Sequence, residues 1–205
     1  MRGFYFARKR VNGEVAVIDN EEVKAYPNAQ LPEYQTHKSA GADFYCAEEV
    51  EVPSIWSGVL ESIGNRLSNV ANALIGNATQ PDNIAFKPTI IHTGIKADME
   101  TDEVLELYNR SSNPGKLGLI LANSVGVVDA DYFNNVDNDG EIMFAFYNFM
   151  PWSVTVKVGD RIGQGVFKKY LRPVEGLRVK DAERVGGIGS TDSNNNVSLD
   201  KEVNN

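Results

Sequence analysis

The chain has 205 residues, of which 42% are apolar and 23% charged, and its net charge is -8. This length suits one domain with its own core. The acidic charge disfavours binding to nucleic acid or to an anionic membrane, although a small anionic ligand needs only a few well-placed cations. No apolar run reaches the length of a membrane helix, and the charged start lacks the apolar stretch of a signal peptide. We therefore expect a cytoplasmic protein.

An Asn12-Gly13 pair separates two strand-like runs, residues 3–11 and 14–18. Both positions of such a two-residue turn need positive φ angles, which asparagine and glycine adopt readily. The pattern predicts an N-terminal hairpin extension over residues 1–24, ahead of a main domain over residues 25–191.

Small residues at positions 39–42 lead into Asp43, which begins a predicted strand. They permit the close approach of a ligand or of another chain, but they also suit a tight bend. Cys46 is the single cysteine, so the sequence excludes an intrachain disulfide and a cysteine-rich metal site. Its apolar neighbours predict a buried, unreactive thiol.

One helix is expected, within an insertion at about residues 55–86. Apolar residues recur there at steps of three and four, the spacing of one helix face. They are Leu60, Ile63, Leu67, Val70, Ala71 and Leu74. Gly76 follows where a C-terminal cap belongs. We predict a helix over about residues 57–76, with its apolar face packed on the domain, on a neighbouring subunit or on a foreign partner.

Short strand-like runs, separated by Gly, Pro, Asn and Asp turns, make up most of the remaining chain. The runs are 86–96, 104–109, 117–128, 141–149, 153–158 and 161–170. They predict an all-β sandwich or barrel, and no strand–helix alternation supports a parallel sheet. Residues 192–205 are rich in Asn, Ser and charges, which predicts a flexible C-terminal tail.

The loop from Asn134 to Gly140 imitates the start of a calcium-binding loop, with Asn135, Asp137 and Asp139 at alternate positions. The closing bidentate carboxylate of such a loop would fall at Phe146. Phenylalanine cannot bind calcium, so we expect a polar hairpin loop instead.

Chemistry-bearing residues gather between Asn123 and Tyr132. The apolar run 125–128 predicts a strand that presents Asp129 and Asp131 on one face, because strand side chains alternate. The amide of Asn123, a nearby glycine that permits close backbone approach and the ring of Tyr132 complete a set suited to a small polar ligand. The alternative is a hairpin end with solvated carboxylates.

Three further segments suit phosphate binding, because each combines a cation with hydroxyls, amides or glycines. They are Arg-Ser-Ser at 110–112, Gly-Asp-Arg-Ile-Gly-Gln at 159–164 and the Gly-rich arm at 184–191. Residues 113–115, Asn-Pro-Gly, predict a turn. Together with the carboxylates, these segments indicate phosphoryl or nucleotidyl chemistry. The chain lacks GxxxxGK[ST], so it is not a P-loop enzyme.

Five motifs, taken in order, closely resemble those of the trimeric dUTPase family (deoxyuridine triphosphate nucleotidohydrolases). They occupy residues 40–44, 110–112, 123–132, 159–164 and 184–191, and segments 31–36 and 93–95 also look like family signatures. The resemblance implies a jelly-roll-like antiparallel β-barrel and a homotrimer with active sites between subunits. It further implies Mg²⁺-dependent hydrolysis of dUTP to dUMP and pyrophosphate.

The family's residue roles carry over to matching positions. The resemblance implies that Asp129 activates the attacking water, that Asp43 supports the magnesium ion through water and that Tyr132 excludes a ribose 2′-hydroxyl. The implied substrate-binding residues are Asn123, Gly126, Tyr132, Arg110, Ser111, Ser112, Gln164, Arg184, Gly187, Ile188, Gly189, Ser190 and Thr191. One carboxylate suffices for Mg²⁺, because this ion keeps most of its waters and binds through phosphates.

The chain departs from the usual family pattern in several places. The last motif is one residue shorter, and Ile188 stands where an aromatic ring commonly stacks on the base. The helical insertion, the N-terminal hairpin and a longer loop after Tyr132 are additions, which fit the varied dUTPases of viruses and phages. Such additions would stabilise the trimer, cover the site or bind a partner.

Two other functions compete with this interpretation. The related dCTP deaminase shares the fold and the Arg-Ser-Ser segment, but it needs a glutamate where this chain has Ala145, so we favour hydrolysis. A regulatory protein-binding role through the helix at 57–76 would add to catalysis.

Several conspicuous residues receive structural interpretations. His37 and His92 lack a partner carboxylate at a telling spacing. Trp56 and Trp152 are predicted to be packing residues. Arg161 suits a structural ion pair and a phosphate contact equally.

Overall fold

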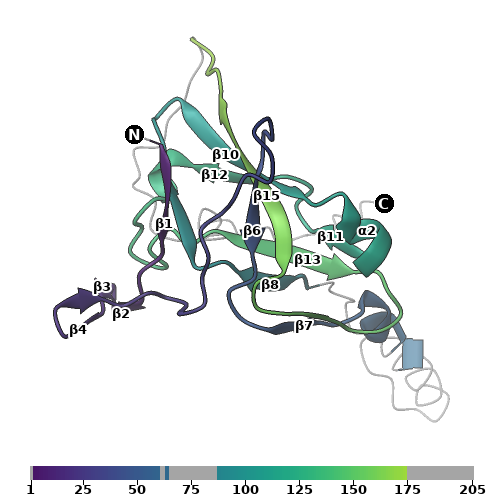
Figure 1. The fold of residues 1–205 in the computed structure, drawn as a ribbon. Coiled ribbons are helices and arrows are strands. Elements are labelled where there is room, and N and C mark those ends of the chain that lie inside the picture. Colours follow the sequence, from purple (N-terminus) through teal and green to yellow (C-terminus); the bar gives the residue numbers. More distant parts are fainter. Residues whose placement is uncertain (1, 61–62, 65–86, 175–205) are drawn as a thin grey trace, which may run out of the picture.

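The structure is a computed structural model that describes residues 2–60, 63–64 and 87–174. Its strands are β1 (Gly3–Phe6), β2 (Arg10–Val11), β3 (Glu14–Val15), β4 (Val17–Ile18), β5 (Glu21–Glu22), β6 (Ala42–Tyr45), β7 (Val50–Val52), β8 (Thr89–His92), β9 (Ile95–Asp98), β10 (Glu103–Asn109), β11 (Leu119–Leu121), β12 (Gly126–Asp129), β13 (Met143–Asn148), β14 (Val154–Val156) and β15 (Arg161–Lys169). The helices include α2 (Ser112–Leu117) and a 3₁₀ turn, η1 (Ala130–Tyr132). The all-β prediction is confirmed (Figure 1).

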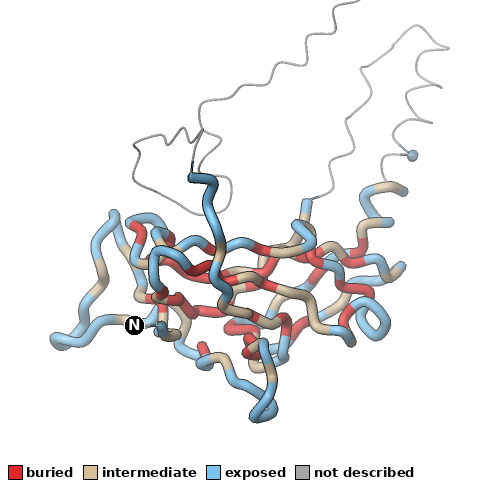
Figure 2. Tube along the Cα trace, turned by 90° about the horizontal axis from the view of Figure 1, so that it is seen from above, coloured by how far each residue is buried: buried red, intermediate tan, exposed pale blue. Residues whose placement is uncertain are grey.

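Two antiparallel sheets form the body of the molecule. One has the order β12-β10-β15-β6, and the other has the order β11-β13-β8. Large apolar side chains from both sheets form one core, with Phe44, Leu105, Phe144 and Phe146 fully buried. Figure 2 shows the buried residues along the centre of the body and exposed residues at the loops. Among the described strands, no pairing closes the two sheets into one continuous barrel.

Two apolar runs that the sequence predicts as single strands are each divided in two. The run 86–96 becomes β8 and β9, which pair with β13 and β1 respectively. The break lies at Gly94, where φ is 66° and a Cβ atom would stand 2.6 Å from that of Ala29. The run 117–128 likewise divides into β11 and β12. At each break the chain passes from one sheet to another.

The N-terminal segment contains the predicted hairpin, but its first strand belongs to the body. Asn12 and Gly13 have φ angles of 52° and 82° and connect β2 to β3 as predicted. A second hairpin, β4–β5, follows, and both hairpins project from the body (Figure 1). β1 instead pairs with β9, which is far away in sequence, and these two strands form a sheet of their own.

The start of the predicted helix is present at residues 55–60 and 63–64, and the rest of the 57–76 prediction lies outside the described residues. No described helix is long and apolar enough to span a membrane. The packing role predicted for the two tryptophans is wrong, because Trp56 is 46% exposed and Trp152 is 63% exposed. The Trp56 indole N–H donates to the carbonyl of Phe149 at 3.0 Å, so it is held at the surface by backbone rather than in the core.

Candidate functional site

Asp43 and Gln164 meet across the neighbouring strands β6 and β15. They are directly opposed in the antiparallel register, so their side chains lie on the same face of the sheet. The Gln164 amide donates from Nε2 to Oδ1 of Asp43 at 2.8 Å. Asp43 is a buried carboxylate, although it lies on an edge strand of this sheet. The structure therefore brings together two of the predicted site residues, from the first and fourth motifs.

A register shift in β15 adds Arg161 to this pair. The pairing of β15 with β6 is irregular between Arg161 and Gly163, as expected at a β-bulge, which re-aims a side chain. The Arg161 guanidinium donates from Nη1 to Oδ2 of Asp43 at 3.1 Å and is 41% exposed. Each carboxylate oxygen of Asp43 thus has a protein donor, and Arg161 forms the ion pair that was one of its two expected roles.

The glycines on either side of Gln164 explain how this face is formed. A Cβ atom at Gly163 would lie 2.0 Å from the Phe144 ring, and one at Gly165 would lie 2.6 Å from the Phe44 ring. Strand side chains alternate between faces. Glycine at both positions therefore lets β15 lie directly on the aromatic core while Gln164 points to the opposite face.

The Arg-Ser-Ser segment lies beside this cluster, at the end of β10. Asn109, the last residue of β10, pairs with Gly163 of β15. Arg110 donates from Nη1 to the carbonyl of Arg161 at 3.1 Å, and Ser111 is exposed at the start of α2. The predicted turn at 113–115 is wrong, because these residues form part of α2. Proline is tolerated in the first helical turn, where its missing N–H costs no hydrogen bond.

The central motif departs from its prediction after Asp129. The strand β12 ends at Asp129, and η1 begins at Ala130. Asp131 therefore lies in a 3₁₀ turn, and the predicted shared strand face with Asp129 is wrong because the alternation ends with the strand. Both carboxylates are exposed.

The register of the four-stranded sheet separates Asp129 from the Asp43 cluster. Val104 of β10 pairs with Asp129, whereas Tyr108 pairs with Gln164, which in turn pairs with Asp43. The row of paired residues that contains Asp129 and the row that contains Asp43 are therefore four residues apart along β10. The strands β12 and β6, which carry these two carboxylates, are the opposite edges of the sheet. At about 3.3 Å per residue and about 4.8 Å per strand, Asp129 and Asp43 lie roughly 20 Å apart. Within one chain, the two carboxylates are too far apart to contact one phosphate group.

The ligand-facing roles predicted around Asp129 stay predictions, but the surroundings of these residues are clear. Asn123 is exposed in the turn before β12. A Cβ atom at Gly126 would lie 3.0 Å from that of Leu107, so this glycine permits the close approach of β10. Tyr132 is only 6% exposed, and its hydroxyl donates to the carbonyl of Glu141 at 3.0 Å. Its ring is therefore rigidly held before any ligand arrives.

The Gly-rich arm lies outside the described residues. This applies to the predicted site residues Arg184, Gly187, Ile188, Gly189, Ser190 and Thr191, and to the predicted tail at 192–205. Their roles rest on the sequence alone.

His92, which the sequence predicts to be isolated, has a carboxylate partner. Nδ1 of His92 lies 3.1 Å from Oε2 of Glu141, and the Tyr26 ring stacks on the imidazole at 4.9 Å between centroids. The hydrogen bond with Glu141 raises the pKa of His92 above its ordinary value. Spacing along the chain could not reveal this pair, because β8 and β13 bring together residues 49 positions apart. Cys46 is buried as predicted, and burial raises its pKa to about 11.

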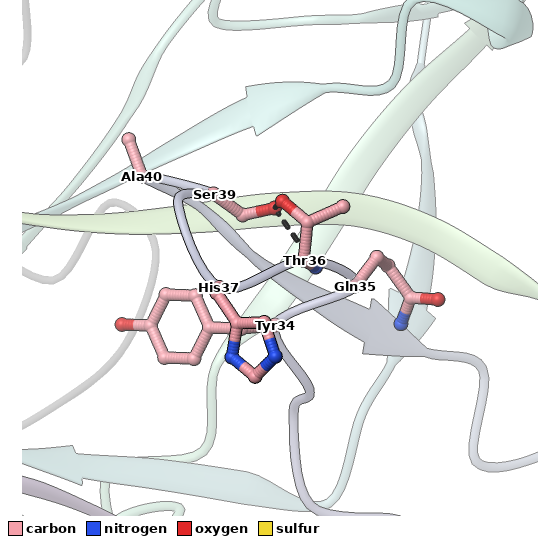
Figure 3. A pocket seen from close by; sticks show the side chains of 6 residues that line it. All are labelled: Tyr34, Gln35, Thr36, His37, Ser39 and Ala40. Atoms are coloured by element: carbon pink, nitrogen blue, oxygen red, sulfur yellow. Dashed lines mark hydrogen bonds between the residues drawn. The ribbon is translucent and has the colours of Figure 1, made fainter.

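A hollow of about 770 Å³ opens in the loop that leads to β6 (Figure 3). It is lined by Tyr34, Gln35, Thr36, His37, Ser39 and Ala40. The hydroxyls of Thr36 and Ser39 lie 2.8 Å apart and close the loop. Part of this loop lies in the segment 31–36 that resembles a family signature, but the sequence predicted no site residue in it. The loop adds exposed rings and hydroxyls close in sequence to Asp43.

The donors around Asp43 fit a hydrated magnesium ion better than a directly bound one. Within the described ranges, no three His, Cys, Asp or Glu side chains form a group that would hold a metal. Each oxygen of Asp43 accepts one protein hydrogen bond and has a further lone pair. Mg²⁺ usually keeps several waters and binds through substrate phosphates. A single carboxylate that accepts hydrogen bonds from these waters is consistent with that behaviour.

Known proteins with similar sequences and structures share one description. The dUTPase family model matches residues 82–193, which is more than half of the chain. A deoxyuridine 5′-triphosphate nucleotidohydrolase of Lactococcus lactis is 45% identical over 113 residues, covering 54% of this chain and 75% of that protein. The corresponding protein of Wolinella succinogenes is 30% identical over 173 residues, covering 82% and 91%.

Among solved structures, the crystal structure of the dUTPase from Streptococcus mutans matches with a TM-score of 0.56 and 31% identity. The match covers 85% of this chain and 99% of that one. The chain belongs to the dUTPase family.

Proposed function

We propose that this chain hydrolyses dUTP to dUMP and pyrophosphate with Mg²⁺, as a homotrimer whose active sites lie between subunits. The separation of the motifs within one chain carries the trimeric part of this proposal. Asp43, Gln164 and Arg110 gather at one place in the sheet, and Asp129 lies roughly 20 Å from Asp43 by strand geometry. A second copy of the chain would supply an Asp129 that the first cannot bring to its own phosphate-binding residues.

In the proposed reaction, Asp129 acts as a general base toward the attacking water. Asp129 is exposed at the end of a strand, so it is accessible to water in a site between subunits. Arg110, Ser111, Ser112 and Gln164 would bind phosphate oxygens and orient the triphosphate for attack. When bound, Mg²⁺ would neutralise charge that develops on the phosphates.

The nucleoside would be recognised by the central motif. Asn123 is exposed in the turn before β12 and has an amide suited to the uracil edge, close in sequence to Gly126. Tyr132 would limit space around the sugar and exclude a ribose 2′-hydroxyl. Arg184, Gly187, Ile188, Gly189, Ser190 and Thr191 would cover the triphosphate, with a closure altered by Ile188.

The first test is product analysis with Mg²⁺ and a panel of dUTP, dCTP, dTTP and UTP. We expect dUMP and pyrophosphate from dUTP, and a loss of 10²–10⁴-fold, in order of magnitude, in the rate of Asp129→Asn. Conversion of dCTP to a uracil nucleotide would instead identify a deaminase. Ala145 of β13 argues against that outcome, because it offers no carboxylate where the deaminase is expected to have one.

A subunit-mixing experiment tests whether the sites are shared. Asp129→Asn and a Ser111→Ala/Gln164→Ala variant would each be nearly inactive alone. Co-refolding them in equal amounts would place intact halves on adjacent subunits in about one quarter of the sites of a cyclic trimer. Recovery of activity together with a trimeric mass by light scattering supports the proposal. A trimer that recovers no activity contradicts the shared site.

A protein partner at the inserted helix and a cytoplasmic location are further parts of the proposal. Trp56, Leu60 and Ile63 are exposed apolar residues in the described part of the helix, as expected for an unoccupied docking face. Hydrogen exchange of residues 55–64 in the assembled protein would distinguish a face that contacts a neighbouring subunit from one that is free to bind a partner. Strong protection in the assembly alone would assign it to the subunit interface and leave no surface for a partner.

A further inference from the structure

The loop after Tyr132 forms hydrogen bonds with both the side-chain hydroxyl and the backbone carbonyl of this tyrosine. Asn138 donates from Nδ2 to the Tyr132 hydroxyl at 2.8 Å, and that hydroxyl donates to the Glu141 carbonyl at 3.0 Å. Asn135 donates from Nδ2 to the backbone carbonyl of Tyr132 at 3.0 Å. The hydroxyl and the backbone of one residue are therefore both tied to the segment 135–141.

The side chains of the two asparagines also organise the loop itself. Asn135 donates to Oδ1 of Asn138 at 2.8 Å, and the same Oδ1 accepts the N–H of Gly140 at 3.2 Å. Oδ1 of Asn135 accepts the N–H groups of Asp137 and Asn138, each at 3.0 Å. These bonds leave Nδ2 of Asn138 oriented toward the Tyr132 hydroxyl.

A buried charge cluster anchors the loop to the rest of the protein. Asp139 is 0% exposed and accepts hydrogen bonds from Arg8, Arg10 and Lys96. Arg8 and Arg10 come from the N-terminal segment, and Lys96 comes from β9. Gly140 follows with φ of 82°, and a Cβ atom there would lie 2.6 Å from the Tyr132 carbonyl. The loop therefore has little freedom to move relative to Tyr132.

We propose that Asn138 is a positioning residue for Tyr132 and that it sharpens the choice of deoxyribose over ribose. The inference rests on the proposed function, in which the Tyr132 ring excludes a 2′-hydroxyl. A site that rejects a substrate because of one additional hydroxyl is weakly selective when the side chain that excludes this hydroxyl can move aside. The Tyr132 ring, whose hydroxyl is hydrogen-bonded by Asn138, moves aside less readily than a ring held by apolar packing alone.

The test compares kcat/KM for dUTP and UTP in three variants of the full chain. Asn138→Ala removes the donor to Tyr132 together with the oxygen that accepts from Asn135 and Gly140. Tyr132→Phe removes the hydroxyl, with its bond to Glu141, and keeps the ring. The double variant combines the two changes. We expect each single change to lower the dUTP/UTP ratio about 3–10-fold, the range of one hydrogen bond. The double variant should lower the ratio by less than the product of the two single effects, because the Asn138–Tyr132 bond is already lost in each single variant.

Asp137→Ala is the matched control. Asp137 is exposed in the same loop, and its backbone N–H, which the change leaves in place, bonds to Asn135. This variant should keep the wild-type ratio. A general loosening of the loop would lower the activity toward both nucleotides and leave their ratio unchanged.

The outcomes separate this inference from the function on which it rests. Wild-type protein that does not hydrolyse dUTP overturns the proposed function. Active wild-type protein with an unchanged ratio in Asn138→Ala overturns the positioning role and leaves the function intact. If Asn138→Ala does not fold, Tyr132→Phe decides: a lowered ratio supports the tie at the hydroxyl, and an unchanged ratio overturns it.

Discussion

Asp43 and Asp139 are both buried carboxylates, but their partners differ in number and in exposure. Asp139 binds three cationic side chains, and the most buried of them is Lys96, with 5% of its side chain exposed. Asp43 has one cationic partner, Arg161, which is 41% exposed, and one amide partner, Gln164. Asp139 is enclosed by cationic side chains that compensate its charge inside the protein. The partners of Asp43 reach the surface, where they remain available to a ligand.

The pKa of Asp139 shows how strongly its cluster is coupled. Burial by itself raises this pKa, but hydrogen bonds from Arg8 and Lys96 outweigh burial and lower the pKa to about 2. Burial also lowers the pKa of Lys96, against the effect of its bond to Asp139. A buried charge of this kind is costly when its partner is lost. The comparison thus indicates that Asp139 serves stability, and it is consistent with the ligand-related role proposed for Asp43.

The largest expected effect is on the stability of Asp139→Asn. This change leaves Lys96 and two arginines without their shared counter-charge, so the free energy of unfolding should fall by about 3–5 kcal/mol. Urea or guanidinium unfolding measures this loss. Asp137→Asn, at an exposed position of the same loop, should change the stability by less than about 0.5 kcal/mol. Equal stability in the two variants would remove the distinction between the clusters.

Low pH should destabilise the protein by protonating the Asp139 carboxylate. A carboxylate whose pKa is lowered on folding stabilises the protein above its unfolded pKa, and the effect is lost as the pH falls through the folded pKa. For Asp139, that window runs from an unfolded pKa of about 4 down to its folded pKa of about 2. The wild-type protein should lose more stability across this window than Asp139→Asn does.

A smaller effect, mainly on rate, is expected for Asp43→Asn. The asparagine keeps an oxygen acceptor for Gln164 but loses the charge that faces Arg161 and the proposed hydrated magnesium ion. We expect a 10–100-fold loss in kcat/KM for dUTP, in order of magnitude, from misplaced phosphate-binding groups. The stability should fall by only about 1 kcal/mol, because Arg161 is partly exposed. A larger loss of stability with unchanged kinetics would assign Asp43 a structural role.

The smallest effect concerns a pair whose cation titrates near neutral pH. The pKa of His92 is raised, mainly by its hydrogen bond with Glu141. A raised pKa stabilises the fold fully below the unfolded value of about 6.5, and this contribution is lost as the pH rises through the folded pKa. Unfolding at pH 6 and pH 9 should reveal a loss of about 0.5–1 kcal/mol from this pair.

Glu141→Gln is the matched variant for the histidine pair. It keeps an oxygen for the N–H of Gly94, which Glu141 accepts at 3.0 Å, and removes the negative charge that faces His92. The pH-dependent loss should shrink in this variant. A slope equal to that of the wild type would show that the effect arises elsewhere in the protein.

Local patterns in the sequence predicted local structure well. The Asn12-Gly13 turn was predictable because its positive φ angles are a property of those two residues. The all-β class followed from many short apolar runs. The breaks within runs 86–96 and 117–128 were not predictable, because each run is apolar on both sides of the point where it changes sheets.

The sequence indicated candidate site residues but not how they are grouped in space. The motif containing Asp129 and the motif containing Gln164 are both evident in the sequence, but their separation depends on the register of β10 with two neighbouring strands. Asp139 looked like a solvated loop residue, since the arginines that bury it lie more than a hundred positions away. Pairing over such distances leaves no periodic signal.

The sequence by itself determined the all-β class, the turn at Asn12-Gly13, the ordered motifs and the family to which they belong. These depend on the backbone preferences and chemistry of neighbouring residues, which act over a few positions. Only the tertiary structure decided that Asp43 and Asp129 lie apart, that Asp139 is enclosed and that Asn138 holds Tyr132. Strand order and register decide these contacts, because they set which distant residues share a row of the sheet.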